Sequence, residues 1–450
     1  MNYIHKLYKS LVNGNERSVL VKKNILLSFL IKGWGCLVQF LLVPITLKCL
    51  NQYEYGIWLT INSILVWIDT FDIGLGNGLR NNLAASIAKG NIERARIQIS
   101  TTFILLAIIV IPLILSVYCL IELIDIYKIL NVSQLIVPDL KGILIISFAL
   151  VGTTFIFKII GNVFMGLQQI AISNSLVVIG QTVSLIGIFI LTKTESPKLI
   201  SVAFIYTFSP LLVYLLSYPI TFTKYYYLRP SIKKFRANEI NRLITMGVKF
   251  FLAQISGLVI FTSSNLLISH LFSPTEVTPF QIANRYFGLT NIAFTIISAP
   301  FWTATTDAYS KNDWQWIRNS EKKMRNIILL FIICIIIMLI VAKPFFHIWV
   351  GLSIKIPTHL TVLLAFYMVT IIYSTCYSNF ICGIGKIKVL TISTILEAVI
   401  YIPFAILFGK LFGVSGIVVS LILVTLTSAI LNKAQFSLLS KGTAKGIWNE

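Results

Sequence analysis

Charge is scarce in this sequence, and acidic charge is the scarcest. Only 16 of the 450 residues are Asp or Glu, and charged residues of both signs make up 12%, about half the share in an ordinary soluble protein. Hydrophobic residues make up 57%, and the mean hydropathy is +0.86. A soluble chain of this length cannot bury so much apolar surface. The composition therefore excludes a soluble globular protein and predicts a multi-pass membrane protein.

Reactive and metal-binding side chains are also few, and they do not cluster. The six cysteines lie within or beside apolar runs, without the spacing of a disulfide framework or a zinc site. The four histidines are scattered. The sequence contains no phosphate-binding GxxxxGKS or GxxxxGKT loop and no nucleophile set beside a base. We therefore expect no metal, no cofactor and no catalytic residues, and we do not expect an enzyme.

Apolar runs long enough to cross a bilayer recur along the whole chain and predict twelve transmembrane helices. The runs fall roughly at residues 25–47, 53–75, 99–121, 142–163, 170–192, 199–223, 244–271, 279–303, 326–348, 357–383, 389–409 and 413–435. The fold class that follows is an all-α polytopic membrane protein.

The cations are distributed unevenly among the connections. Of the 37 Lys and Arg residues, 25 fall in the two tails and the alternate connections, and 8 fall in the others. The positive-inside rule then places both termini in the cytoplasm. Residues 1–24 are expected to form a retained basic arm rather than a cleaved signal peptide. This asymmetry accounts for most of the net charge of +21, so we expect no nucleic-acid partner.

A polar segment, "FDIGLGNGLRNNLAASIAKGNIERARIQ" (71–98), interrupts the apolar sequence, and part of it recurs. "AKGNIERAR" (88–96) aligns with "SKNDWQWIR" (310–318) at an offset of 222. "NVFMGLQQI" (162–170) aligns with "NFICGIGKI" (379–387) at an offset of 217. The order and the nearly constant offset predict two repeats of six helices. Because six is even, both repeats enter from the same side, so they are parallel.

The repeat divides the chain into predicted domains. These are a cytoplasmic arm (1–24), an N-terminal six-helix bundle (25–223), a cytoplasmic linker (224–243), a C-terminal six-helix bundle (244–435) and a cytoplasmic tail (436–450). Two such halves can rock against each other around a central cavity. The polar segment then serves as an amphipathic connector, or as an inner gate or lipid-headgroup contact through Arg80.

Three motifs resemble one known family. "WIDTFDIGLGNGLRNNLA…AKGN", "SAPFWTATTDAYSKND" and "NVFMGLQQIAISN" are similar to motifs of Wzx-type flippases, which belong to the multidrug, oligosaccharidyl-lipid and polysaccharide exporter superfamily. The resemblance implies a V-shaped transporter fold, like that of multidrug MATE exporters, in the bacterial inner membrane. It implies transport of an undecaprenyl-diphosphate-linked oligosaccharide, of O-antigen or capsule, from the cytoplasmic to the periplasmic leaflet. It also implies a polysaccharide polymerase and a chain-length regulator as partners.

Two other functions remain open. One is a multidrug or small-molecule cation antiporter on the same fold, which is hard to reconcile with Lys32 and Arg285 facing a cavity. The other is a membrane-embedded polysaccharide polymerase. Polymerases of that kind usually carry a large outer loop, and the longest outward connection here spans only residues 122–141.

Cations inside the predicted spans are candidates for binding the substrate, because a charge in a bilayer is costly without a function. We expect Lys32, Lys249, Arg285 and Arg80 to contact the anionic substrate. Arg285 is the strongest candidate, because its planar guanidinium group can bind two phosphate oxygens at once. Lys158 is a further cavity candidate. Simple snorkelling to the headgroups is the alternative for Lys158, Lys249 and Arg285.

The intramembrane acids and amides complete the candidate list. Glu397 is too short to snorkel, so it must face water or a cation, and it could couple transport to protons or sodium or form a structural ion pair. Asp69 and Asp72 could pair with lysines or belong to the gate. Asn62 and Asn284, matched by the repeat, could hydrogen bond to sugar hydroxyls or join helices.

Overall fold

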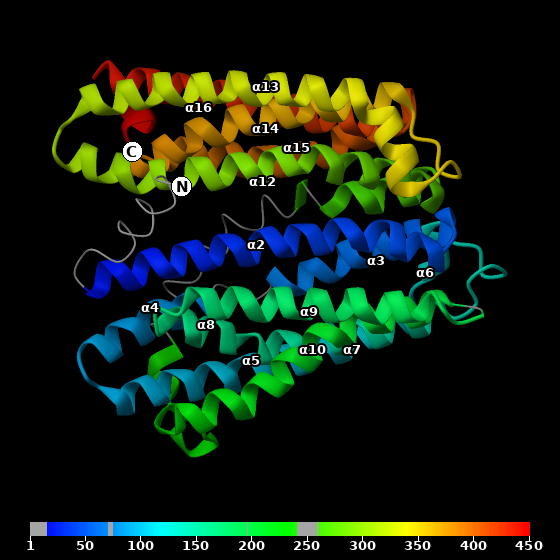
Figure 1. The fold of residues 1–450 in the computed structure, drawn as a ribbon, viewed down its shortest axis with the longest axis horizontal. Coiled ribbons are helices and arrows are strands. Elements are labelled where there is room, and N and C mark those ends of the chain that lie inside the picture. Colours follow the sequence, from blue (N-terminus) through cyan, green and yellow to red (C-terminus); the bar gives the residue numbers. More distant parts are fainter. Residues whose placement is uncertain (1–15, 71–74, 196, 241–258, 261) are drawn as a thin grey trace, which may run out of the picture. The chain divides into compact units, whose positions relative to one another are not determined.

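The computed structural model describes residues 16–70, 75–195, 197–240, 259–260 and 262–450, and within these ranges the regular structure is helical (Figure 1). The described residues group into two compact units. Of the described residues, the first unit draws on those within 16–51, 65–126 and 134–240, and the second on those within 52–64, 127–133 and 259–450. The predicted boundaries between the bundles stay a prediction.

The first unit contains most of the helices in the first half of the chain. They are α2 (Glu16–Cys49), the end of α3 (Gln52–Thr70), α4 (Leu75–Ala88), α5 (Ile92–Leu123), α7 (Leu140–Phe157), α8 (Ile159–Gly166), α9 (Ile170–Leu191) and α10 (Leu199–Lys224). Within it α2 packs along α9, α10 packs against α7 and α9, and α5 packs against α4 and α7. Three short 3-10 turns, Tyr226–Leu228, Ile232–Lys234 and Ala237–Glu239, follow α10.

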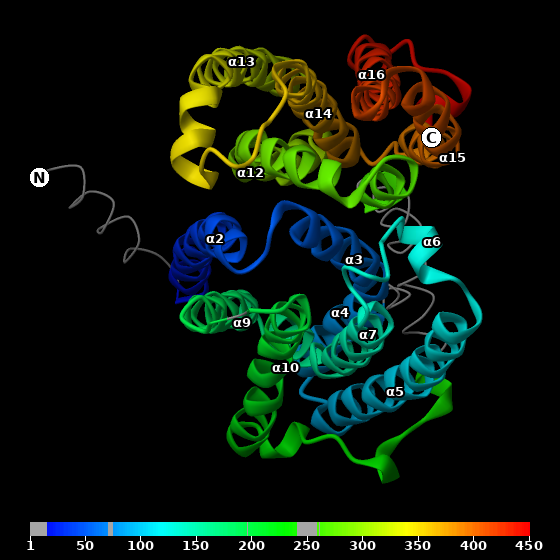
Figure 2. The same cartoon turned by 90° about the vertical axis from the view of Figure 1, so that its right-hand side faces the viewer.

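The second unit contains the start of α3 and the remaining helices. They are α6 (Ile126–Leu130), the helical residues 262–271, α12 (Pro274–Ser310), α13 (Trp314–Val350), α14 (Thr358–Ile384), α15 (Lys388–Phe412), α16 (Val414–Ser440) and a final 3-10 turn, Gly446–Asn449. Within it α14 packs against α12, α13 and α16, and α15 packs against α16 (Figure 2).

The helices confirm the all-α polytopic fold class. Ten of the described helices are long and apolar enough to cross a membrane. Eleven of the twelve predicted spans coincide with described helices, namely these ten and the shorter α3. The fourth span is broken at Lys158, between α7 and α8. The seventh span, 244–271, lies largely outside the described residues. Backbone groups in lipid must be satisfied within the span, which is why long apolar runs translate so directly into helices.

The predicted repeat is visible in the turns that precede α5 and α13. Gly90 and Asn312, which are 222 residues apart, both have positive φ, at 70° and 56°. The next residue caps the helix in each case. The Asn91 side chain accepts from the Arg94 amide at 3.0 Å, and the Asp313 side chain accepts from the Trp316 amide at 2.8 Å. Because the same turn occurs at the same offset, the aligned segments share a local structure as well as a sequence pattern.

The repeat also appears in tertiary packing, at the end of the fourth helix of each half. A Cβ added to Gly166 would lie 2.8 Å from the side chain of Leu83. A Cβ added to Gly383, 217 residues later, would lie 2.6 Å from the side chain of Thr305, which is 222 residues after Leu83. Each half therefore uses a glycine to seat the last turns of this helix against the segment that follows its second span.

The polar segment after the second span folds as the amphipathic helix α4. Leu75, Leu79 and Leu83, four residues apart, are fully buried among side chains of α5 and α8. Arg80 lies on the exposed side of the helix. This packing fits the connector role, and a gate or headgroup role for Arg80 stays a prediction.

Candidate functional site

The predicted site residues fall in both units. In the first unit, Lys32 on α2 and Arg80 on α4 are exposed, and Lys158 is half-buried. In the second unit, three predicted residues are half-buried and one is buried; they are Asn62, Asn284, Arg285 and Glu397, in that order. Lys249 and Asp72 lie outside the described residues. Asp69 lies on α3, and its side chain is also outside what the structure describes. That the two sets line one cavity stays a prediction.

The start of α3 is held tightly against the start of α12. A Cβ added to Gly56 would lie 1.7 Å from the backbone oxygen of Pro274. The Gln52 side chain donates to the Thr275 carbonyl at 3.1 Å, and the Thr278 hydroxyl donates to the Gln52 carbonyl at 2.7 Å. Residues 52–64 therefore form part of the framework that positions α12.

A row of polar side chains crosses this framework. The Asn265 amide donates to the Ser63 hydroxyl at 2.6 Å, and the Gln281 amide donates to the Asn265 carbonyl oxygen at 2.7 Å. Ser63 and Asn265 are 8% and 2% exposed. Their satisfied hydrogen bonds offset the cost of burying them in an apolar bundle. The sequence did not reveal this row, because Ser63, Asn265 and Gln281 are far apart along the chain and each is common in helices.

Arg285 lies on α12 one turn beyond Gln281. It follows Gln281 by four residues, so the two side chains share one face of α12. The guanidinium is close enough to the Tyr55 hydroxyl to interact with it electrostatically. Among the described residues, no carboxylate lies within ion-pair distance of Arg285. A half-buried guanidinium with polar neighbours and no described counter-charge can accept an anion at low desolvation cost.

Glu397 lies in a separate cluster, between α15 and its neighbours. It is 8% exposed, and one carboxyl oxygen has no hydrogen-bond partner among the described residues. Ser428 on α16 lies beside the carboxyl group. One turn along α15, Tyr401 shares a 2.7 Å hydrogen bond with Ser264. Among the described residues, no cation lies within ion-pair distance of Glu397.

The burial of Glu397 constrains its chemistry. A buried carboxylate without a counter-charge is expensive, so the group must carry a proton or bind a cation. Hydroxyl and carboxyl oxygens are suitable ligands for either proton exchange or a hard cation. The arrangement can therefore hold a proton or a small cation.

A second buried carboxylate, Glu321, went unnoticed in the sequence because it lies in the charged segment "RNSEKKM". It accepts hydrogen bonds from the Tyr377 hydroxyl at 2.7 Å and from Lys433 Nζ at 3.0 Å. Lys433 also donates to Tyr377 at 2.7 Å and lies over its ring, 4.4 Å from the centroid. The group joins α13, α14 and α16, and its complete pairing indicates a structural role.

We expect the Lys433→Met substitution to destabilise the protein by about 2–3 kcal/mol, because Glu321 would remain buried without its closest cation. The loss stays below the ~3–5 kcal/mol for a fully buried pair, because the Lys433 side chain is 34% exposed. The measurement is denaturant-induced unfolding of the purified protein in detergent. The exposed Lys441→Met is the control, and equal losses in both variants would contradict the role of the buried group.

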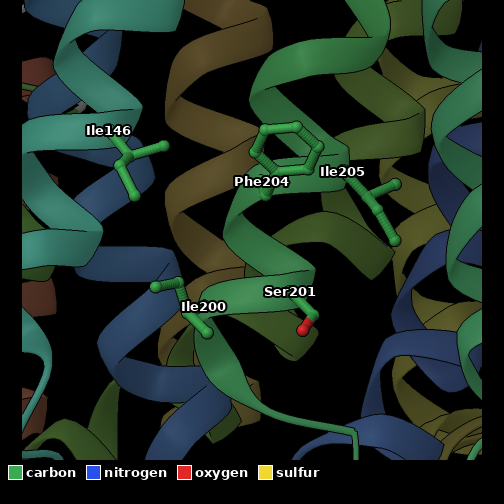
Figure 3. Close-up of a pocket in the computed structure, with 5 residues that line it drawn as sticks. All are labelled: Ile146, Ile200, Ser201, Phe204 and Ile205. Carbon is green, nitrogen blue, oxygen red and sulfur yellow. The ribbon is translucent and has the colours of Figure 1, made fainter.

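The groove lined by Ile146, Ile200, Ser201, Phe204 and Ile205 is not a substrate site for a charged headgroup (Figure 3). It lies between α7 and α10, and Ser201 is its one polar lining residue. An open apolar groove of this kind is what lipid tails fill in a membrane protein. The described cations that are predicted to contact the substrate lie elsewhere, on α2, α4 and α12.

The helices and their order define a class, a multi-pass membrane protein with a MATE-like fold. Solved MATE transporters of the MOP superfamily share it. An inward-facing multidrug resistance MATE structure aligns with a TM-score of 0.76 at 16% identity, covering 91% of this chain and 96% of that one. An outward-facing one aligns with a TM-score of 0.60 at 16% identity, covering 95% and 97%. At this identity the likeness concerns the fold alone.

The family is shown by sequence. Residues 21–304 match the family model described as "Polysaccharide biosynthesis protein", and the chain belongs to that family. A putative O-antigen export protein of Yersinia pseudotuberculosis is 24% identical over 389 residues, which are 82% of this chain and 85% of that protein. A putative O-antigen transporter of Salmonella typhimurium is 20% identical over 404 residues, covering 86% and 89%. The resemblance noted from the three motifs is confirmed.

Proposed function

We propose that this protein is a flippase that moves undecaprenyl-diphosphate-linked oligosaccharide repeat units from the cytoplasmic to the periplasmic leaflet by alternating access. The units belong to O-antigen or a related polysaccharide, as the names of the relatives suggest. The observation that carries the proposal is Arg285, a half-buried cation one turn beyond the hydrogen-bonded Gln281, in a polysaccharide-biosynthesis family member. A diphosphate is the anion that such a guanidinium suits best.

The energetics of this transport favour export once the headgroup can enter the protein. A diphosphate carries about two negative charges, and moving them outward across an inside-negative membrane is downhill by about 4.6 kcal/mol per 100 mV. The obstacle is desolvation of the charges within the bilayer. In the proposed mechanism Arg285 and Lys32 lower that cost, and Asn62 and Asn284 contact the sugars. No chemical bond is made or broken.

The direct test is a flipping assay in proteoliposomes that contain a polyprenyl-diphosphate oligosaccharide and the purified full-length protein. We expect the protein to expose the sugar to an external glycosidase faster than protein-free liposomes do. The MATE-like fold supports one competing function, a cation antiporter. Uptake of cationic dyes without any flipping of the lipid-linked sugar would favour that function and reject the flippase.

Gradient coupling through Glu397 is a separate part of the proposal. We expect Glu397→Gln to slow glycan export about tenfold, equivalent to ~1.4 kcal/mol, without lowering the amount of protein in the membrane. Gln keeps the size of the side chain and a partner for Ser428, but it cannot exchange a proton. The measurement is export rate in proteoliposomes with and without an imposed pH or sodium gradient. Ser428→Ala, which keeps the carboxyl group, is the control, and a normal rate for Glu397→Gln would remove coupling through this residue.

The proposal places the protein in the bacterial inner membrane with both termini in the cytoplasm, near a polymerase and a chain-length regulator. We expect reporters fused after Lys234 or Lys322 to report a cytoplasmic location, and a reporter after Pro138 to report a periplasmic one. The physical reason is the cation asymmetry of the connections. Topology reporters in intact cells make the measurement, and the reverse pattern at two of these sites would overturn the orientation.

A further inference from the structure

The segment that follows α10, residues 224–239, is fixed across the first turns of α5. Leu228 is fully buried in the hydrophobic core of the first unit. Arg96 on α5 donates to the Arg229 carbonyl at 2.8 Å, and the Ser231 amide donates to Ser100 Oγ at 3.1 Å. Further along, the Arg236 amide donates to Thr101 Oγ1 at 3.1 Å. We call these residues the linker strap.

The contacts with α5 indicate the depth at which the linker strap lies in a bilayer. α5 has 32 residues, so it is about 48 Å long, whereas a hydrocarbon core is ~30 Å thick. The apolar run of α5 begins near Ile99, beside the residues that hold the strap. α10 ends at Lys224, where the strap begins. Both helices therefore place the linker strap at the boundary between headgroups and acyl chains.

The linker strap carries more positive charge than its protein surroundings neutralise. Its two carboxylate contacts are already matched, Glu93 to Lys234 at 2.8 Å and Glu239 to Arg94 at 3.0 Å. Four further cations are exposed and have no ion pair among the described residues; they are Lys224, Arg229, Lys233 and Arg236. This local surplus lies at the level where anionic lipid headgroups would meet it.

Apolar side chains project from the same strap. Ile232 is 84% exposed and Tyr226 is 74% exposed, although the backbone around them is hydrogen bonded to α5 and within its own turns. Exposed aliphatic and aromatic side chains interleaved with cations are typical of segments that lie in a membrane interface. A solvated loop would gain nothing from holding Ile232 rigidly in water.

We propose that the linker strap is a binding surface for anionic phospholipid headgroups. Lys224, Arg229, Lys233 and Arg236 contact the lipid phosphates, and Ile232 and Tyr226 enter the boundary with the acyl chains. The occupant is bilayer phospholipid, because the surface is open, lies at headgroup level and combines charge with apolar side chains. The strap would thereby tie the ends of α5 and α10 to one leaflet.

The test uses the full-length protein in nanodiscs of synthetic lipid, which contain no lipid-linked sugar. The melting temperature is compared between pure phosphatidylcholine and a mixture with phosphatidylglycerol. We expect the rise caused by phosphatidylglycerol to fall by at least half in the variant K224Q/R229Q/K233Q/R236Q. The control K198Q/K343Q/K355Q/K410Q removes the same charge at exposed lysines outside the strap and should keep the rise. Equal rises in the strap variant and the unchanged protein, or equal losses in the strap variant and the control, would overturn the proposal.

A second measurement does not depend on how well the charge variants fold. A photoreactive amino acid replaces Ile232 in the otherwise unchanged chain, and mass spectrometry detects the crosslinked lipid. We expect phosphatidylglycerol adducts at position 232 above their share in the nanodisc, and few lipid adducts when the same amino acid replaces the exposed Lys89, in the turn before α5. Absence of lipid adducts at position 232 would reject the interfacial placement, and adducts in proportion to lipid composition would reject the preference for anionic lipid.

Discussion

We expect Arg285→Ala to abolish surface glycan and to reduce transport by about 100-fold or more. That factor corresponds to ~2.8 kcal/mol, which is within the range for truncating one partner of a desolvated, hydrogen-bonded charge pair. Arg285→Lys retains part of the activity, because lysine keeps the charge but loses the planar fork that can bind two phosphate oxygens. The assay is surface polysaccharide in a strain lacking its own flippase gene, measured beside the abundance of the protein in the membrane.

The snorkelling alternative for Arg285 gives a different pattern. If the guanidinium only reaches the headgroups, we expect Arg285→Lys to leave surface glycan almost unchanged and Arg285→Ala mainly to lower the amount of protein in the membrane. Lys410→Ala, at an exposed cation on α15, is the matched control for loss of one charge. Normal glycan from a well-expressed Arg285→Ala protein would remove Arg285 from the substrate path. Such a result in vivo, together with flipping in proteoliposomes, would leave the flippase function standing with a different anion site.

Gly56→Ala is expected to have the largest effect on stability. The added methyl group would lie 1.7 Å from the Pro274 oxygen, and a backbone oxygen cannot move aside as a flexible side chain can. Overpacking of this kind typically costs ~1–3 kcal/mol, and the overlap here puts the expected loss at about 3 kcal/mol. The substitution would also displace α3 from α12, so we expect loss of the Gln52 contacts and of transport. Denaturant-induced unfolding in detergent measures the stability.

Gly288→Ala is the matched control for Gly56→Ala. Gly288 is also on a membrane helix, and a Cβ there would have no heavy atom within 4 Å. Since alanine favours helix over glycine, we expect this variant to be as stable as the unchanged protein or slightly more so. If both substitutions have the same effect, the close approach of α3 and α12 does not limit stability.

The two carboxylates buried in the second unit illustrate why burial alone does not identify a site. Glu321 is satisfied by Tyr377 and Lys433, so it stabilises the packing of three helices. Among the described residues Glu397 has no ion pair and retains an oxygen without a hydrogen bond. The difference in pairing, and not in depth, makes Glu397 the candidate for coupling.

The sequence by itself determined the helices and the repeat. It did not determine the helix ends, because polar turns extend several helices beyond the apolar run: α13 begins at Trp314 and not at 326, and α2 begins at Glu16 and not at 25. A chain in lipid must satisfy its backbone within each span, so apolar length alone predicts α5 or α14. The turn at Gly90 and Asn312 was predictable for a similar reason, because residues that tolerate positive φ and residues that cap helices have strong local preferences. The motifs also identified the family, which the match over residues 21–304 confirms.

The tertiary structure alone decided which side chains meet. Gln281 is 16 residues from Asn265 along the chain, and Ser63 is about 200 residues from both, so only the packing within the second unit joins the three side chains. An ion pair between Glu397 and a lysine stays a prediction, because Lys249 lies outside the described residues. The physical reason is that an almost uniformly apolar helix gives little indication of its rotation about its own axis, so its neighbours depend on shape, as at Gly56, and not on any pattern along the chain.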